Sequence, residues 1–188
     1  MQDNMGLSGK TVDAKSIVDR GGPVVGSGIS IVGALLVLLG FVLPWASCGN
    51  FKLSGLDIVT QSLSGELSDM GNSSGTLLCL VPFFALGTLG VALLVIPSSL
   101  WKKIPSPVKL IGTCLAGLFT VLGCCPTCLF FTNIQSSRRD AGGFIQIEYG
   151  FWITVFGLAV SFLGVLVGIG TSVASIVMSR KTTVEGTQ

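Results

Sequence analysis

Four long stretches of this chain contain no Asp, Glu, Lys or Arg. They cover residues 21–50, 70–101, 110–137 and 149–179. Each holds an apolar run long enough to cross the hydrocarbon layer of a membrane, which is about 30 Å thick and takes about 20 residues of helix. The runs are rich in Leu, Val and Gly and do not alternate polar with apolar residues, so helices are expected rather than a barrel. We predict spans near residues 24–45, 77–96, 108–131 and 151–178.

The composition is typical of an integral membrane protein. Charged residues make up 11% of the 188 residues and hydrophobic ones 49%, whereas soluble domains carry about 25% charged residues. The net charge of +2 and the lack of a basic cluster exclude a nucleic-acid-binding surface. The expected fold class is therefore all-α, an integral bundle of four transmembrane helices in the cell membrane, with the lipid bilayer as its first partner.

The basic residues predict how the chain is oriented. Cytoplasmic segments carry an excess of Lys and Arg, and with both ends inside, eight basic residues lie on the inner side against Lys52, Arg138 and Arg139 outside. Trp45 and Trp152 then lie at the outer interface. The parts of this prediction are cytoplasmic tails 1–23 and 179–188, a transmembrane domain 24–178, outer loops 46–76 and 132–150, and an inner loop 97–107.

The predicted spans lack the groups on which most membrane chemistry depends. An ionisable residue inside a membrane usually marks an ion or proton path, and the only Asp, Glu, Lys or Arg in the four spans is Lys109, at the inner end of the third. The chain also has no histidine, the commonest metal ligand and the usual general base near neutral pH. We therefore expect no cofactor and no metal site, and a proton-coupled transporter or pump acting alone is disfavoured.

Glycines recur every seven residues in the first and last spans. Such ridges of small residues let two helix backbones approach closely and so drive helix association in lipid. The pattern is equally consistent with packing inside the bundle and with docking to a helix of another protein. The predicted helix-packing residues are Gly26, Gly33, Gly40, Gly157, Gly164 and Gly168.

Five of the six cysteines are expected at the outer face. Cys124, Cys125 and Cys128 lie near the outer end of the third span, and Cys48 and Cys79 flank the first outer loop. Because the outer side of a cell membrane is oxidising, a structural disulfide is one interpretation, joining Cys48 to Cys79 or either of them to Cys128. Packing as buried thiols is the second interpretation.

The third interpretation is redox catalysis. The layout resembles that of the quinone-linked disulfide-forming membrane enzymes, which have four helices, both ends inside and an outward-facing C-x-x-C. That resemblance implies a thiol–disulfide oxidoreductase that uses Cys125 and Cys128, with Cys48 and Cys79 as further outer cysteines. The chain departs from the pattern because Pro126 falls inside a span instead of opening a helix.

The two outer loops carry local signals. Ser54 is followed three residues later by Asp57, the spacing of a helix start. Val59, Leu63 and Leu67 then recur every four residues, which predicts a short amphipathic helix lying on the interface. In the second loop, residues 144–149 alternate in a way that fits either a short strand or the approach to the last helix.

The segment FVLPWASCGNFKLSGLDIV, residues 41–59, resembles a recurring segment of small bacterial four-helix membrane proteins of uncharacterised function. In both, an L-P-W-x-x-C exit from the first helix leads into an L-S-G-x-D loop. The matching residues are Leu43, Pro44, Trp45, Cys48, Leu53, Ser54, Gly55 and Asp57. The resemblance implies a topology and a bacterial origin, and no activity.

These observations favour a non-catalytic accessory or assembly subunit of a membrane protein complex. The partners would be other membrane subunits or further copies of the chain, reached through the small-residue helix faces. The thiol–disulfide oxidoreductase is the second hypothesis, and a homo-oligomeric pore is the third.

Overall fold

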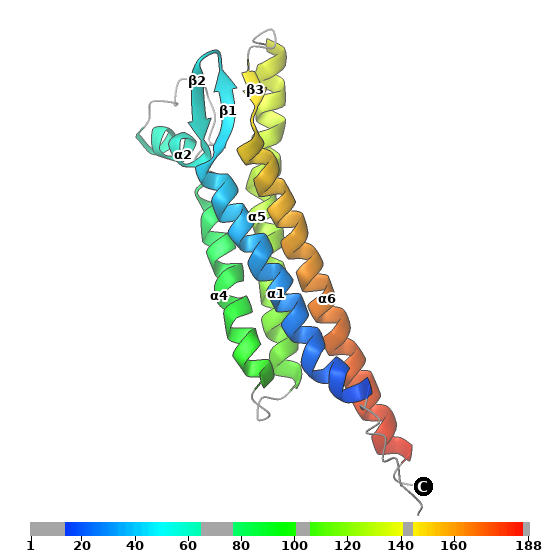
Figure 1. The fold of residues 1–188 in the computed structure, drawn as a ribbon. Coiled ribbons are helices and arrows are strands. Elements are labelled where there is room, and N and C mark those ends of the chain that lie inside the picture. Colours follow the sequence, from blue (N-terminus) through cyan, green and yellow to red (C-terminus); the bar gives the residue numbers. More distant parts are fainter. Residues whose placement is uncertain (1–13, 65–76, 101–105, 141–144, 186–188) are drawn as a thin grey trace, which may run out of the picture.

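The protein is described by a computed structural model over residues 14–64, 77–100, 106–140 and 145–185. It is mostly helical: long helices lie side by side, and a small sheet with a short helix covers one end (Figure 1). The long helices are α1 (Ala14–Val42), α4 (Leu80–Leu100), α5 (Ser106–Asp140) and α6 (Tyr149–Glu185).

Three of these helices are long and apolar enough to cross a membrane. Their apolar segments are Val24–Val42 in α1, Leu110–Arg139 in α5 and Tyr149–Ala174 in α6, and α4 holds a shorter one, Leu80–Ile96. The helices extend past the predicted spans, because α1 begins at Ala14 and α6 ends at Glu185. In α5 the helix continues to Asp140 instead of ending near residue 131, so residues 132–140 of the predicted second outer loop are helix.

The long helices form an antiparallel bundle in which each contacts two neighbours. α1 packs between α6 and α4, and α5 also packs between α6 and α4. α1 and α5 run toward the capped end, and α4 and α6 run away from it (Figure 1). The α1–α6 pair has the most extensive contact in the molecule.

The expected all-α fold is incomplete, because the end of the predicted first span and the two predicted outer loops contribute a three-stranded antiparallel sheet. Its strands are β1 (Pro44–Cys48), β2 (Phe51–Ser54) and β3 (Ile145–Ile147), in the order β2-β1-β3. Gly49 has φ 60° in the two-residue turn between β1 and β2, which fits the type II′ hairpin turn that takes glycine first. β3 pairs Ile145 with Cys48 and Ile147 with Ala46, so the sheet ties the second loop to the first.

The short helix α2 (Gly55–Ser64) begins where the sequence predicts. The Ser54 hydroxyl accepts from the Asp57 N–H at 3.1 Å, and the Asp57 carboxylate accepts from the Ser54 N–H at 2.9 Å. This reciprocal pair is a capping box. The Ser54 N–H, with the Ser54 hydroxyl, holds the pKa of Asp57 below its usual value. The buried face of α2 is Gly55, Ile58 and Val59, while Leu63 is exposed. The placement of α2 on a membrane interface stays a prediction, and Leu67 lies outside the described residues.

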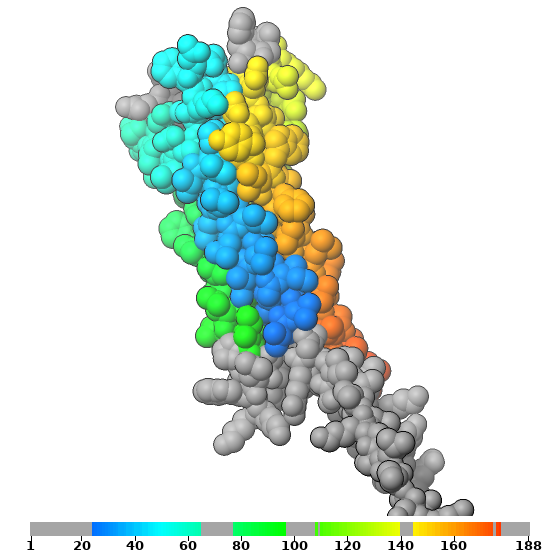
Figure 2. All heavy atoms as spheres, viewed as in Figure 1, coloured from blue at the N-terminus to red at the C-terminus, as the bar shows by residue number. Residues whose placement is uncertain are grey.

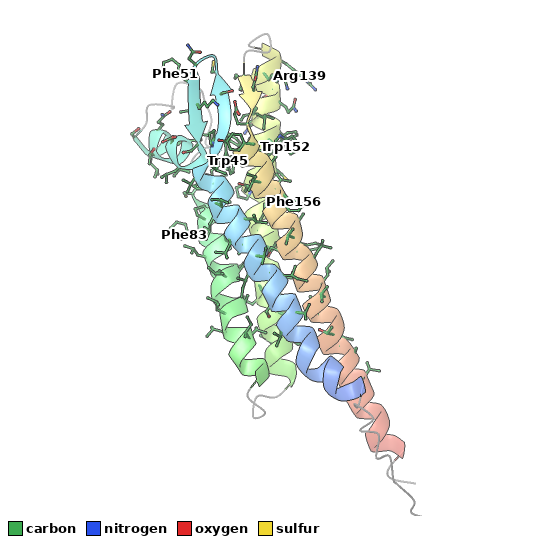
Figure 3. All side chains as sticks on the ribbon, in the orientation of Figure 1. Trp45, Phe51, Phe83, Arg139, Trp152 and Phe156 are labelled. Atoms are coloured by element: carbon green, nitrogen blue, oxygen red, sulfur yellow. The ribbon has the colours of Figure 1, made fainter. Side chains whose placement is uncertain are left out.

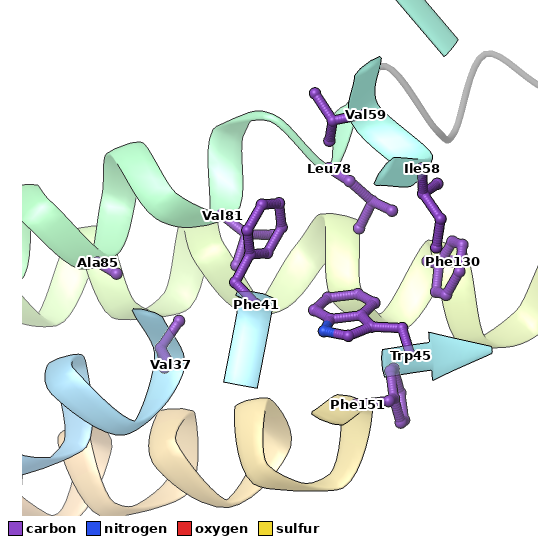
Figure 4. Close-up of a cluster of buried hydrophobic side chains, with 10 residues drawn as sticks. All are labelled: Val37, Phe41, Trp45, Ile58, Val59, Leu78, Val81, Ala85, Phe130 and Phe151. Carbon is purple, nitrogen blue, oxygen red and sulfur yellow. The ribbon is translucent and has the colours of Figure 1, made fainter. Parts of the chain in front are cut away.

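A cluster around Trp45 joins the sheet, α2 and the bundle (Figure 4). Trp45 is fully buried at 0% exposure, and its ring contacts Phe41, Phe130 and Phe151 at centroid distances of 5.5, 5.4 and 5.5 Å. Its indole N–H donates to the Gly40 carbonyl at 2.8 Å. Trp45 is therefore a core residue, contrary to the expectation of an interfacial tryptophan, whereas Trp152 is exposed. We call β1, β2, β3 and α2 the outer cap, after the side of the membrane that the sequence predicts for these loops.

Candidate functional site

A groove runs between α5 and α6 in the half of the bundle next to the outer cap. It has a volume of about 660 Å³ and is lined by α5 from Thr120 to Thr132 and by α6 from Phe151 to Phe162. At its outer end Phe131 stacks on Phe151 at 5.6 Å and meets Trp152 edge-on at 6.4 Å. We call this feature the α5–α6 groove.

The lining of the groove is chemically apolar. Its threonine hydroxyls all donate to carbonyls of their own helix, Thr120 to Ala116, Thr127 to Gly123 and Thr132 to Leu129, at 2.9, 3.0 and 2.9 Å. Their hydrogen bonds are satisfied locally, so what they present to the groove is largely methyl groups. No charged side chain is among the lining residues. The groove therefore suits a hydrocarbon ligand better than a polar one.

Two thiols line this groove side by side. Cys124 Sγ lies 3.7 Å from Cys128 Sγ, one helical turn apart on α5. Sequence reasoning paired Cys125 with Cys128; the structure instead brings Cys124 to Cys128, because residues four apart share a helix face. Cys125 is exposed and is not part of the lining. Pro126 lies inside the helix, as expected from its place in the span.

The other cysteines lie apart from this pair. Cys48 is exposed at the end of β1, and Cys79, just before α4, packs against the Trp45 cluster. All six cysteines are free thiols in the structure. A disulfide among Cys48, Cys79 and Cys128 stays a prediction. The described residues contain no group of His, Cys, Asp and Glu side chains that could hold a metal ion.

The predicted glycine ridges meet each other. A Cβ built on Gly26 would lie 2.7 Å from the Gly168 nitrogen, and one on Gly164 would lie 2.6 Å from the Ser30 nitrogen. Gly33 abuts Ser161 and Gly157 in the same way, and Gly40 abuts Thr154 and Gly150. α1 and α6 are thus in backbone contact at intervals of seven residues on both helices, and Figure 2 shows them touching along the bundle.

The glycine pattern was consistent with packing inside the bundle and with docking to a helix of another protein, and this contact shows packing inside the bundle. The ridges of α1 and α6 cover each other within the chain, so they are not free to receive a helix of another protein. A hydrogen bond from the Ser30 hydroxyl to the Ser161 carbonyl, 3.3 Å, crosses the same interface. The glycines belong to the fold of the bundle, and any docking surface lies elsewhere.

Comparisons with protein-family models, with curated proteins and with solved structures find no match to this chain. The function of the protein is therefore inferred from its geometry and chemistry.

Sequence reasoning missed two parts of the site. Cys124 could have been found from its spacing of four from Cys128 on a helix. The wall formed by Phe131, Phe151 and Trp152 left no such signal, because its residues come from two helices that no local pattern aligns. The hairpin of the outer cap did leave one, since Gly49-Asn50 between two short β-prone runs is a hairpin turn sequence.

Proposed function

We propose that the protein crosses the cell membrane four times, with both ends inside, and serves as a non-catalytic accessory subunit of a membrane protein complex that it contacts through the outer cap. The single observation that carries the docking proposal is Phe51. Its ring is 79% exposed at the tip of the β1–β2 hairpin, the part of the cap farthest from the bundle (Figure 3).

The outward-facing side chains support a fourth crossing. Large apolar residues point away from the bundle on every long helix, including Phe83 and Leu94 of α4, which are 68% and 72% exposed. In water such a surface would mark an aggregation or docking site, whereas in lipid it is the ordinary exterior. α4 also runs antiparallel between α1 and α5, both long enough to span, and its 17 apolar residues reach the lower limit for a crossing.

The position of Phe51 is different from that of the lipid-facing residues. β1 climbs from the end of α1 at about 3.3 Å per residue, so the hairpin tip lies well beyond the capped ends of α1, α4 and α6 and about level with the end of α5 (Figure 1). Trp45 and its cluster hold that hairpin rigidly on the bundle. A large apolar side chain presented to water on a rigid support is typical of an anchor residue at a protein–protein interface.

The glycine ridges no longer support docking, since α1 and α6 bury them against each other. In the apolar segments of the described helices, the only Asp, Glu, Lys or Arg side chains are Arg138 and Arg139 at the end of α5, so none lies deep in a span where it would serve catalysis or ion transport. The outer cap is the remaining surface that we consider as a docking site, and its exposed Phe51 supports a partner contact on the proposed outer side.

The test compares two phenylalanines of similar exposure. Phe51→Ala and Phe83→Ala proteins are purified from native membranes in mild detergent and their co-purifying proteins are identified. Phe51→Ala should lose a partner that the wild type and Phe83→Ala retain, while all three keep the same thermal unfolding temperature. If Phe51→Ala and the wild type carry the same proteins, docking through the cap is wrong.

Orientation has a separate test. Membrane-impermeant maleimide should label the exposed Cys48 in intact cells, because the cap is placed outside. Cys48→Ser should remove that label. A cysteine introduced at Lys102, which lies outside the described residues, should react only after the membrane is opened. Labelling at Lys102 in intact cells would overturn the N-in, C-in placement.

The thiol–disulfide oxidoreductase remains the second candidate, and one observation favours it. The 3.7 Å contact between Cys124 and Cys128 brings two thiols within reach of a disulfide. The groove offers no basic side chain to stabilise a thiolate, the reactive form. Trapping a mixed disulfide between Cys124→Ser protein and a soluble thiol oxidoreductase would promote this candidate; no trapped species is expected.

A further inference from the structure

We propose that the α5–α6 groove is a binding site for one anionic glycerophospholipid of the outer leaflet, whose acyl chain fills the groove and whose phosphate is held by Arg138 and Arg139. The inference goes beyond the proposed accessory role and rests only on its placement of the four helices in the membrane.

The groove has the length of one leaflet. From Thr120 to Thr132 it follows α5 for about 18 Å, close to half of a hydrocarbon layer that is about 30 Å thick. It lies in the half of the bundle next to the outer cap. A chain anchored at the outer surface would therefore run down the groove and end near the middle of the bilayer, where the groove also ends.

The same face of α5 changes from apolar to basic above the groove. Successive residues of an α-helix are rotated by about 100° around its axis. Seen down the axis of α5, Gln135 and Arg138 therefore lie about 20° and 80° to one side of Cys128, and Arg139 lies about 20° to the other side. All three fall within the arc of α5 that lines the groove. Arg139 is about 10 Å above Thr132 along the axis, and a long arginine side chain can bend toward the interface to meet a headgroup.

The two arginines are available to an anion as far as the described side chains show. Both are exposed, and neither makes an ion pair with a side chain that the structure describes, Glu148 beside the start of α6 included; the Asp140 side chain is outside that set. Figure 3 shows Arg139 projecting on the same side of the molecule as Trp152. An apolar groove of one-leaflet length with two exposed cations above it has the shape and charge pattern of an anionic lipid with its tail inserted.

Trp152 supplies the measurement, because it lines the groove. The purified protein, carrying Trp101→Phe, is reconstituted in vesicles of unlabelled phosphatidylcholine. Increasing mole fractions of a lipid with brominated chains are included, either phosphatidylglycerol or phosphatidylcholine. Bromine quenches tryptophan fluorescence on contact, and the fully buried Trp45 provides a constant background. The mole fraction of brominated phosphatidylglycerol at half-maximal quenching should be lower than that of brominated phosphatidylcholine by on the order of tenfold. A difference of this size is expected for two basic residues near a membrane surface.

Three variants test which part of the site is responsible. Arg138→Gln with Arg139→Gln should abolish the preference for phosphatidylglycerol, whereas Lys52→Gln, which removes a cation on the hairpin, should keep it. Ala159→Phe, which fills the groove from α6, should weaken quenching by both lipids. Equal quenching by both lipids in the wild type, or a preference that survives loss of both arginines, would overturn the proposal. Absence of quenching by either lipid would refute the membrane placement itself as well as the site.

Discussion

Helix α6 packs against α1 through small residues and against α5 through large aromatic ones. Toward α1 it presents Gly157 and Gly164, and the two backbones touch. Toward α5 it presents Phe151, Trp152 and Phe162, and a groove of about 660 Å³ remains between the helices. Small residues remove the side chains that keep helices apart, whereas large rings hold the backbones at a distance and leave space that no third element fills. We call these the close interface and the open interface.

The open interface closes toward the other end of the bundle. There a Cβ on Gly117 would lie 2.9 Å from a Val165 methyl group, and one on Gly168 would lie 2.9 Å from the Thr113 methyl group. The distance between α5 and α6 is therefore set by residue size along one pair of helices. The groove exists only where the aromatic residues are.

The largest effect is expected from adding a side chain to the close interface. Gly33→Leu places a branched side chain against the backbone of Ser161, which cannot move aside without separating the helices. Overpacking costs about 1–3 kcal/mol where neighbours are side chains and more where they are rigid, so we expect about 3 kcal/mol of lost unfolding free energy in detergent. Thermal or chemical unfolding followed by circular dichroism measures it.

Gly28→Leu is the matched control for this substitution. Gly28 lies on the same helix, and a Cβ there meets nothing within 4 Å. It should change stability by less than about 0.5 kcal/mol, the usual range for surface sites. Equal losses from Gly33→Leu and Gly28→Leu would show that α1 and α6 are not in backbone contact.

A substitution in the outer cap should lower the local stability of α2 without changing either interface of α6. Ser54→Ala removes one half of the capping box of α2 and should cost about 1 kcal/mol locally. Because the pKa of Asp57 is lowered in the folded protein, its contribution is present above the unfolded pKa and is lost as the pH falls through the folded one. The protection of α2 amides against hydrogen exchange, taken relative to the intrinsic rate at each pH, should therefore fall in acid for the wild type and be low already at neutral pH for Ser54→Ala. Thr60→Ala, on the exposed side of α2, is the control.

A smaller effect is expected from the polar contact across the close interface. Ser30→Ala removes the hydroxyl that donates to the Ser161 carbonyl, and such bonds between membrane helices average about 0.6 kcal/mol. Thr171→Ala is the comparison, because that hydroxyl bonds only within its own helix, to the Val167 and Gly168 carbonyls. If Ser30→Ala is no more costly than Thr171→Ala in unfolding, backbone contact alone holds the interface.

The smallest effect on stability is expected in the open interface. Ala159→Phe adds a ring to a side chain that faces the groove, where space already exists. It should leave the unfolding temperature in detergent within about 1–2 °C of the wild type, since cores suffer only where added volume meets packed neighbours. A large loss would mean that α5 and α6 close on each other in solution.

Local sequence was sufficient for the existence of the long helices, though not for their ends, and for the start of α2. Charge-free apolar runs must become helices in lipid, because each backbone group then finds its partner within the same segment. Ser54 and Asp57 sit three residues apart and satisfy each other's backbone whatever surrounds them. The seven-residue spacing of the glycines likewise predicted close packing, since helical period alone puts those residues on one face.

Other features depended on partners far away in the chain. β1 pairs with β3 across almost a hundred residues, and nothing near Pro44–Cys48 indicates that second partner. The burial of Trp45 depends on rings from α5 and α6, which is why the aromatic-belt rule placed it wrongly at the interface.

Sequence by itself thus determined which segments are helical, where a capped turn begins and which helix faces are free of side chains. These are properties of neighbours along one chain segment. Only the tertiary structure decided that the glycine face of α1 meets that of α6, that Cys124 rather than Cys125 pairs with Cys128 in contact with a groove, and that two arginines stand above it. Such features require several helices at a defined distance and rotation, and that geometry is set by the size of the side chains between them.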